Sequence, residues 1–147
     1  MTQQEKQLLL KDLCARLPYG VKVCISSESD GRLQINTVTL DIDFLHKYML
    51  DGGYYSHGLF YKTPGFQLLP YLRPMSSMTE EEKEYIKNRW CYNDWDIDGP
   101  SSLWREKIDV EDADGIIDYF NEHHLDYREL IPMGLALEAS PDMYKTE

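Results

Sequence analysis

Long apolar runs are missing from this sequence of 147 residues. No stretch of about eighteen consecutive apolar residues occurs, which argues against a helix that spans a membrane. The first residues, 1–13, mix charged side chains with leucine and lack the basic-then-apolar layout of a secretion signal. We therefore expect a soluble, cytoplasmic protein.

Cysteines are few and widely spaced. The three, Cys14, Cys24 and Cys91, form no C-x-x-C pair, and an odd number does not build a disulfide framework. Cys14 falls in an apolar helical pattern and Cys24 in a strand pattern, so both are predicted to be small core or near-core residues. No candidate base lies near Cys91 in the sequence, which argues against a catalytic thiol.

Sequence motifs of catalysis are also lacking. The glycines do not precede the Lys-Ser/Thr ending of a phosphate loop, and no G-x-S-x-G, H-E-x-x-H or zinc spacing occurs. His123 and His124 are adjacent in the last turn of an expected helix. Adjacent side chains on a helix point about 100° apart, so the two histidines are poorly placed to bind one metal ion. The helix dipole stabilises positively charged side chains at this end, so a capping role is expected. The sequence therefore favours a non-enzymatic protein. An uncharacterised hydrolase using a carboxylate or histidine stays open as an alternative.

Basic residues are scarce in the second half of the chain. Residues 1–73 hold eight Lys/Arg against seven Asp/Glu, whereas residues 74–147 hold seven against nineteen, within a net charge of −11. Nucleic acids and anionic membranes require a run of cations, so we expect neither as a direct partner. A basic protein or a metal cation is a compatible partner, although acidity also serves solubility alone.

One acidic motif matches part of a known metal-binding loop. Asp94, Asp96 and Asp98 alternate and are followed by Gly99, as in the first half of the loop that wraps Ca²⁺. The twelfth position, which should supply a bidentate glutamate, is Arg105. The motif therefore predicts either a calcium site or a solvated acidic turn.

Tryptophans are interleaved with the acidic residues in the same region. Exposed aromatic side chains are frequent interface anchors, and flanking acids steer a basic partner toward them. The alternative is that the tryptophans anchor a long loop to the core. The candidate protein-interaction residues are Trp95, Trp104, Asp109, Glu111, Asp112 and Asp114.

Hydrophobic periodicity in the first half predicts one helix followed by hairpins. Residues 3–17 have helical spacing, and an alternating strand from residue 21 returns through the Ser29-Asp30-Gly31 turn. Residues 41–53 predict a short helix, unless the second strand continues through residue 44. The remaining extended segments, 54–62 and 66–72, predict a second hairpin, with Pro70 making the later strand an edge or a kinked strand.

The second half is predicted to be helical and irregular. Thr79 and Glu82 form a capping box that opens a helix to about Trp90, and a last helix begins near residues 109–112 and ends near His124. The sequence as a whole predicts a single α+β domain of residues 1–147. Its parts are an N-terminal helix, an antiparallel sheet of about four strands built from hairpins, and C-terminal helices packed on one sheet face.

Three stretches resemble a group of small uncharacterised acidic proteins of gut anaerobic bacteria and their prophages or phages. They are DLCARLPYGVKV at 12–23, YLRPMSSMTEEEK at 71–83, and HLDYR with GLALEA at 124–128 and 134–139. The resemblance transfers no catalytic residue. It implies a mobile-element context, in which small acidic proteins often bind host proteins. We therefore expect an accessory protein that binds a basic host protein, with mimicry of the charge of DNA as a sharper version and a Ca²⁺-binding module as an alternative.

Overall fold

The computed structural model describes most of the chain, in two compact units, Met1–Tyr71 and Leu72–Glu147. The described residues are 2–29, 31–43, 53–56, 59–62, 67–90 and 110–145. Side chains are described for residues 2–26, 31–43, 67–89 and 115–145. The boundary between the units lies close to the point at which the sequence changes from nearly neutral to strongly acidic.

The first unit begins with the predicted helix, α1 (Gln3–Arg16). Thr2 caps it, because its Oγ1 accepts a hydrogen bond from the Glu5 N–H at 3.1 Å and the Glu5 carboxylate accepts one from the Thr2 N–H at 2.6 Å. This capping box satisfies two backbone donors that a helix start leaves unpaired. A short 3-10 turn follows the helix, and Gly20, at φ +68°, adopts the left-handed conformation that glycine accepts most easily.

The buried face of α1 contains charge as well as leucine. Leu9, Asp12, Leu13 and Arg16 are all buried and recur at helical spacing. Asp12 and Arg16 are fully buried and form an ion pair of 2.8 Å between Asp12 Oδ2 and Arg16 Nε. Cys14 is exposed, so its predicted place near the core is wrong: the buried stripe passes through residues 9, 12, 13 and 16 and leaves Cys14 outside it.

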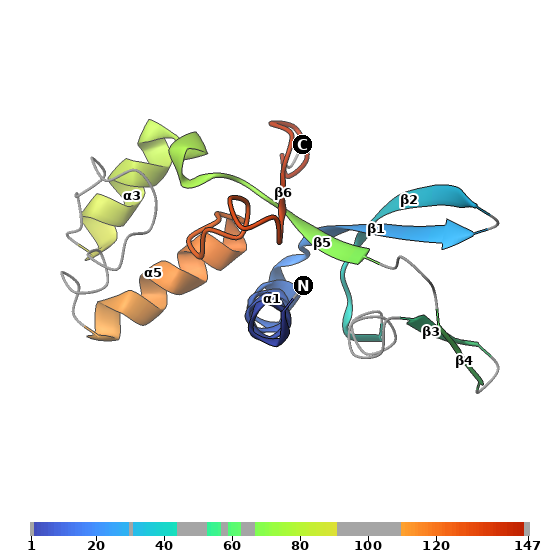
Figure 1. Ribbon diagram of the computed structural model, residues 1–147. Helices are drawn as coiled ribbons and strands as arrows, with labels where there is room; N and C mark the ends of the chain where they lie inside the picture. The colour runs from blue at the N-terminus through green and yellow to red at the C-terminus, as the bar shows by residue number, and fades with distance from the viewer. Residues whose placement is uncertain are drawn as a thin grey trace. The chain divides into compact units, whose positions relative to one another are not determined.

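A four-stranded sheet of order β2-β1-β5-β6 follows, mostly antiparallel. Its strands are β1 (Lys22–Ser29), β2 (Arg32–Thr39), β5 (Gln67–Leu72) and β6 (Leu137–Glu138). β1 and β2 form the predicted hairpin, and β1 pairs on its other side with β5 (Figure 1). Val23 and Leu68 lie on one face of this sheet and are buried. The alternation read from the sequence of β1 thus marks the buried face correctly.

The second predicted hairpin is wrong. Residues 54–62 do not form one strand against 66–72; instead β3 (Gly53–Ser56) and β4 (Leu59–Lys62) pair with each other in a separate two-stranded sheet. β5 pairs with β1, with Pro70 opposite Val23, so Pro70 lies in an inner strand of the sheet and not at its edge. The β1–β5 pairing joins residues more than forty positions apart, and no local turn signal announces it.

The segment after β2 bears on the two alternatives for residues 41–53, a short helix or a strand that continues through residue 44. β2 ends at Thr39, and the Leu40 N–H donates to the Val21 carbonyl at 2.8 Å. Continuation of the strand through residue 44 is therefore wrong. Ile42 and Asp43 are helical, and the rest of the predicted short helix lies outside the described residues.

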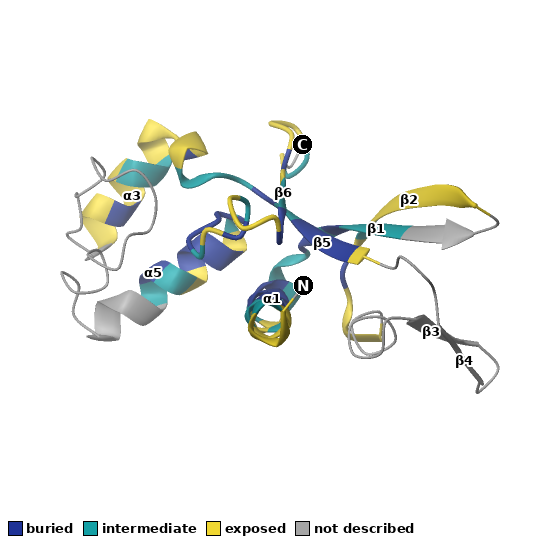
Figure 2. Ribbon diagram, in the orientation of Figure 1, coloured by how far each residue is buried: buried dark blue, intermediate teal, exposed yellow. Residues whose placement is uncertain are grey.

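The second unit contains α3 (Glu80–Trp90) and α5 (Val110–Glu122), which confirm the two predicted helices. α3 packs on α5, each helix has buried positions (Figure 2), and both contribute to one hydrophobic cluster. The buried members of the cluster are Met78, Ile86, Ile116, Tyr119, Phe120, Leu125 and Tyr127. The predicted α+β class is thus confirmed. No helix in the described ranges has the length and apolarity needed to cross a membrane.

The chain after α5 is fixed by backbone hydrogen bonds to Arg73. The Arg73 N–H donates to the His124 carbonyl, and the Asp126 N–H donates to the Arg73 carbonyl, both at 2.8 Å. The buried Asp126 carboxylate then accepts hydrogen bonds from the N–H groups of Leu130 at 2.8 Å and Ile131 at 2.9 Å. The two Arg73 bonds hold the turn that follows α5 against the segment that precedes α3, and the Asp126 carboxylate closes the turn itself.

Candidate interaction site

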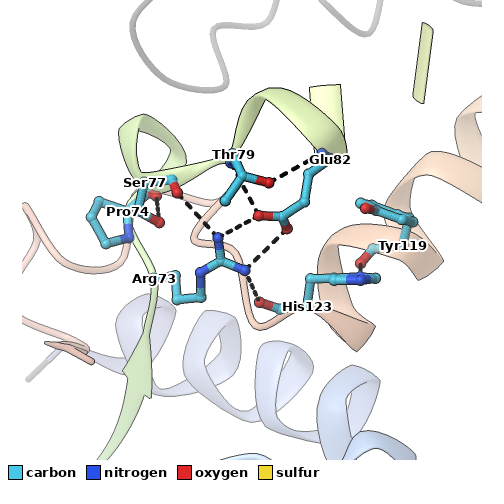
Figure 3. Close-up of polar contacts among 7 residues, drawn as sticks. All are labelled: Arg73, Pro74, Ser77, Thr79, Glu82, Tyr119 and His123. Carbon is cyan, nitrogen blue, oxygen red and sulfur yellow. Dashed lines mark hydrogen bonds and ion pairs between the residues drawn. The ribbon is translucent and has the colours of Figure 1, made fainter. Parts of the chain in front are cut away.

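Arg73 and Glu82 form the best-connected polar pair in the described part of the second unit. Arg73 directly follows β5, and Glu82 lies in the first turn of α3. The two guanidinium nitrogens donate to the two carboxylate oxygens at 2.7 and 3.1 Å (Figure 3). This bidentate geometry is the strongest arrangement available to arginine and a carboxylate.

The same two side chains also bond to the backbone around them. The Arg73 guanidinium donates to the carbonyls of Ser77 at 3.1 Å and His123 at 3.4 Å. Glu82 completes the predicted capping box with Thr79, since each residue's N–H donates to the other's side chain at 3.1 Å. Arg73 thereby ties together the start of α3 and the end of α5.

The Arg73 contact favours the ionised form of the Glu82 carboxyl. Burial by itself would raise the pKa of the Glu82 carboxyl, but the Arg73 guanidinium and the Thr79 N–H together outweigh it and hold that pKa below its ordinary value of 4.5. A carboxyl whose pKa is lowered on folding stabilises the folded state above its unfolded pKa. That contribution is lost as the pH falls through the folded pKa.

We expect Glu82→Gln to be less stable than the natural protein at pH 7, with the difference shrinking as the pH falls from about 5 to 3. Urea unfolding at pH 7, 5, 4 and 3 measures it. Arg73→Gln, which keeps the carboxylate and removes the guanidinium, should show the same shrinking difference. An equal loss of stability at pH 7 and pH 3 in both variants would contradict this role of the pair.

A row of stacked rings lies beside the ion pair. The Tyr85 ring, on α3, stacks on Tyr119, on α5, with a centroid distance of 5.1 Å and an interplanar angle of 18°. Tyr119 stacks in turn on His123 at 3.9 Å, and His123 Nδ1 lies 2.9 Å from the Tyr119 carbonyl oxygen. We call Tyr85, Tyr119 and His123 the aromatic row. Its outer ring, Tyr85, is 52% exposed, whereas Tyr119 is buried.

Charged side chains of both signs lie on the helices that carry the aromatic row, with acidic residues in the majority. Burial, followed by the charge of Glu82, raises the pKa of Tyr119 to about 12; Glu122 acts in the same direction, and the Arg73 guanidinium acts against it. Three glutamates occupy the first turn of α3, where they favour the positive end of the helix dipole. The exposed acidic side chains described on the two helices are Glu80, Glu81, Glu84, Asp118 and Glu122.

A pocket of about 410 Å³ is lined in part by the ion pair. Its lining comprises Arg73, Pro74, Ser77, Thr79, Glu82, Glu138, Ala139, Ser140, Pro141, Tyr144 and Lys145. The Ser77 hydroxyl donates to the Pro74 carbonyl at 2.7 Å, and the Thr79 hydroxyl accepts from the Glu82 N–H. Both hydroxyls therefore form hydrogen bonds with nearby backbone groups. Neither of these contacts is the pairing of a nucleophile with a base that a hydrolase uses.

Most of the predicted site residues fall outside the described part of the chain. These are the metal candidates Asp94, Asp96 and Asp98 and the interaction candidates Trp95, Trp104 and Asp109. Glu111, Asp112 and Asp114 lie on α5, but their side chains are not among those described. Within the described ranges no group of three His, Cys, Asp or Glu side chains could hold a metal ion. The calcium loop therefore stays a prediction.

The aromatic row and the Arg73 pair were not predicted from the sequence. The capping signal identified Glu82 only as a helix-start residue, and no sequence signal marked Tyr85 as a site residue. Tyr119, beside the apolar face of its helix, gave no sign of stacking. The contacts depend on how α3 meets α5, which spacing within one helix does not specify.

The described part of the second unit thus has an exposed ring, exposed carboxylates and a pocket lined by the Arg73–Glu82 pair. Comparisons with models of protein families, with curated proteins and with solved structures find no match. A function is therefore proposed from the geometry and charge of this chain.

Proposed function

We propose that this protein is a non-enzymatic interaction protein whose acidic second unit binds a basic protein partner through the aromatic row. The observation that carries the proposal is the half-exposed Tyr85 ring, which is stacked on Tyr119 and belongs to a helix, α3, that also has the exposed carboxylates of Glu81 and Glu84. A cation above the face of an aromatic ring is attracted by the ring quadrupole. Nearby carboxylates add to that attraction and disfavour an anionic ligand.

The geometry of the row suits it to an anchoring role. Because Tyr85 is stacked on a ring that is itself buried, it loses little conformational freedom on binding. Arginine is the partner side chain that fits best, since its planar guanidinium stacks on an aromatic face and also bonds to carboxylates. Tyrosine and arginine are both enriched among the residues that dominate interface energies.

The charge of the whole unit supports the same type of partner. Residues 72–147 hold eight Lys/Arg against nineteen Asp/Glu, whereas residues 1–71 hold seven of each. A field of one sign over one unit speeds the encounter with an oppositely charged protein. The resemblance to small acidic prophage proteins extends the proposal to a basic host protein. The basic surface of a nucleic-acid-binding protein would be attracted to these carboxylates as it is to the phosphates of DNA.

We expect Tyr85→Ala to weaken binding of an arginine-rich peptide about tenfold, by removal of the ring that receives the guanidinium. Fluorescence anisotropy with a labelled peptide at low ionic strength measures the affinity. Tyr85→Phe keeps the ring face and should bind like the natural protein. Met133→Ala, another exposed apolar side chain of the same unit, should also leave the affinity unchanged.

Two further measurements vary the salt concentration and the sequence of the peptide. Affinity should fall steeply between about 50 and 500 mM salt, because attraction between exposed charges is screened, and a glutamate-rich peptide of equal length should not bind. An affinity that is indifferent to salt, or equal in Tyr85→Ala and Tyr85→Phe, would overturn the proposal.

A further inference from the structure

We infer that two copies of this chain associate through β2, in an antiparallel pairing that extends the sheet of the first unit across a twofold axis. β2 is the outermost strand in the order β2-β1-β5-β6, and it pairs with β1 on one side. Among the described strands none pairs with its other side. Within the described strands, the backbone donors and acceptors on that side are therefore unpaired, as at the edge of a sheet.

β2 lacks the features that usually prevent such pairing. It runs for eight residues without proline or lysine, and its single charged residue is Arg32, at one end. Nearly every side chain on it is exposed (Figure 2), including Leu33 at 63% and Ile35 at 60%. Proteins usually protect an edge with charges, proline, bulges or a very short strand. A long, nearly uncharged edge with two exposed aliphatic side chains is typical of an interface.

Leu33 and Ile35 lie on the same face of the sheet. The register places Ile35 opposite Ser26 and Leu33 opposite Glu28 on β1, and directly opposed residues of an antiparallel pair share a face. Neither aliphatic residue is thus opposed by an apolar residue of β1. A strand added at the free edge would bring apolar side chains next to them.

A second copy of β2 fits this edge without conflict. With Ile35 opposite Ile35 of the second copy, Leu33 meets Thr37, Gln34 meets Asn36, and Arg32 meets Val38. This register keeps the aliphatic residues on one face and places no like charges opposite each other. It is self-complementary, as a twofold interface requires.

The charge distribution also favours a second copy at this edge. Residues 1–71 hold seven Lys/Arg and seven Asp/Glu, so two first units meet without net repulsion, whereas residues 72–147 of two copies would repel. An interface between copies is therefore expected on the first unit. The acidic unit keeps its surface for a basic partner.

Sedimentation equilibrium over a range of protein concentrations tests the inference. The natural protein should be a dimer, and Ile35→Lys should raise the dissociation constant of the dimer about tenfold or more, because it places two ammonium groups opposite each other. Ile42→Lys is the matched control: Ile42 is 68% exposed in the same unit but lies outside β2. It should leave the dimer unchanged.

A cross-link tests the register. With the three native cysteines replaced by alanine, Ile35→Cys should form a disulfide-linked dimer under mild oxidation, since opposed residues at a strand pair lie within disulfide reach. Ile42→Cys should not. Circular dichroism confirms that each variant is folded. A natural protein that stays monomeric up to about millimolar concentration, or a dimer insensitive to Ile35→Lys, overturns the inference, and so does an Ile35→Cys protein that cross-links no faster than Ile42→Cys.

Discussion

Replacing Arg16 with methionine is expected to lower the free energy of unfolding by about 3–5 kcal/mol. Arg16 and Asp12 form an ion pair on α1 in which both side chains are fully buried. Removing the guanidinium leaves a carboxylate in a site with no access to water, and the desolvation of that charge is then no longer offset by its ion pair. Urea unfolding followed by circular dichroism measures the loss.

The double variant Asp12→Leu with Arg16→Met separates the ion pair from the packing. It removes both charges and keeps apolar volume, so it should recover most of the stability lost in the single variant. Lys83→Ala, which breaks the exposed ion pair of 3.3 Å with Glu80, is the control and should cost less than about 1 kcal/mol. If Arg16→Met cost no more than Lys83→Ala, the buried pair would not have the role assigned to it.

Asp126→Ala is expected to lower the free energy of unfolding by about 3 kcal/mol. Both carboxylate oxygens of this buried residue accept backbone hydrogen bonds, one from Leu130 and one from Ile131. Each bond to a charged acceptor contributes about 1.5–3 kcal/mol, and two backbone donors would lose their acceptors at once. Differential scanning calorimetry should show a fall in melting temperature of about 6–12 °C.

Asparagine at the same position distinguishes the hydrogen bonds from the packing. Asp126→Asn keeps one acceptor oxygen and nearly the same volume, so its loss should be about half that of alanine. The exposed Asp142→Ala, whose partner is Lys145, should leave the melting temperature nearly unchanged. Equal losses in Asp126→Asn and Asp126→Ala would show that the second oxygen contributes nothing.

Local signals in the sequence predicted local structure well. The Asp30-Gly31 turn predicted the β1–β2 hairpin, and Gly31 has φ +73°. Thr79 and Glu82 predicted the start of α3, and the same T-x-x-E signal at Thr2 also marks the start of α1. Each of these features is determined by side chains within four residues of the backbone that they bond to.

Contacts between distant residues were not predicted, and these define the candidate site. β5 pairs with β1, which is distant in the sequence. Arg73 bonds to Glu82 because the end of β5 lies near the start of α3. Asp12 and Arg16 are two of the charged residues of an amphipathic helix, yet both are buried. Periodicity marks a helix face, but it does not identify which charged side chains the tertiary structure covers.

The boundary between the two units falls inside β5, so neither unit can be expressed as a fragment without cutting this strand. Residues Gln67–Tyr71 of this strand count with the first unit and Leu72 with the second. In the first unit Pro70 pairs with Val23, and in the second the Leu72 carbonyl accepts a hydrogen bond from the Ala139 N–H at 2.7 Å. A peptide expressed up to residue 71, or from residue 72, would begin or end inside a hydrogen-bonded strand. Gly31, in an exposed hairpin turn, is a better position for inserting a tag or a fluorophore.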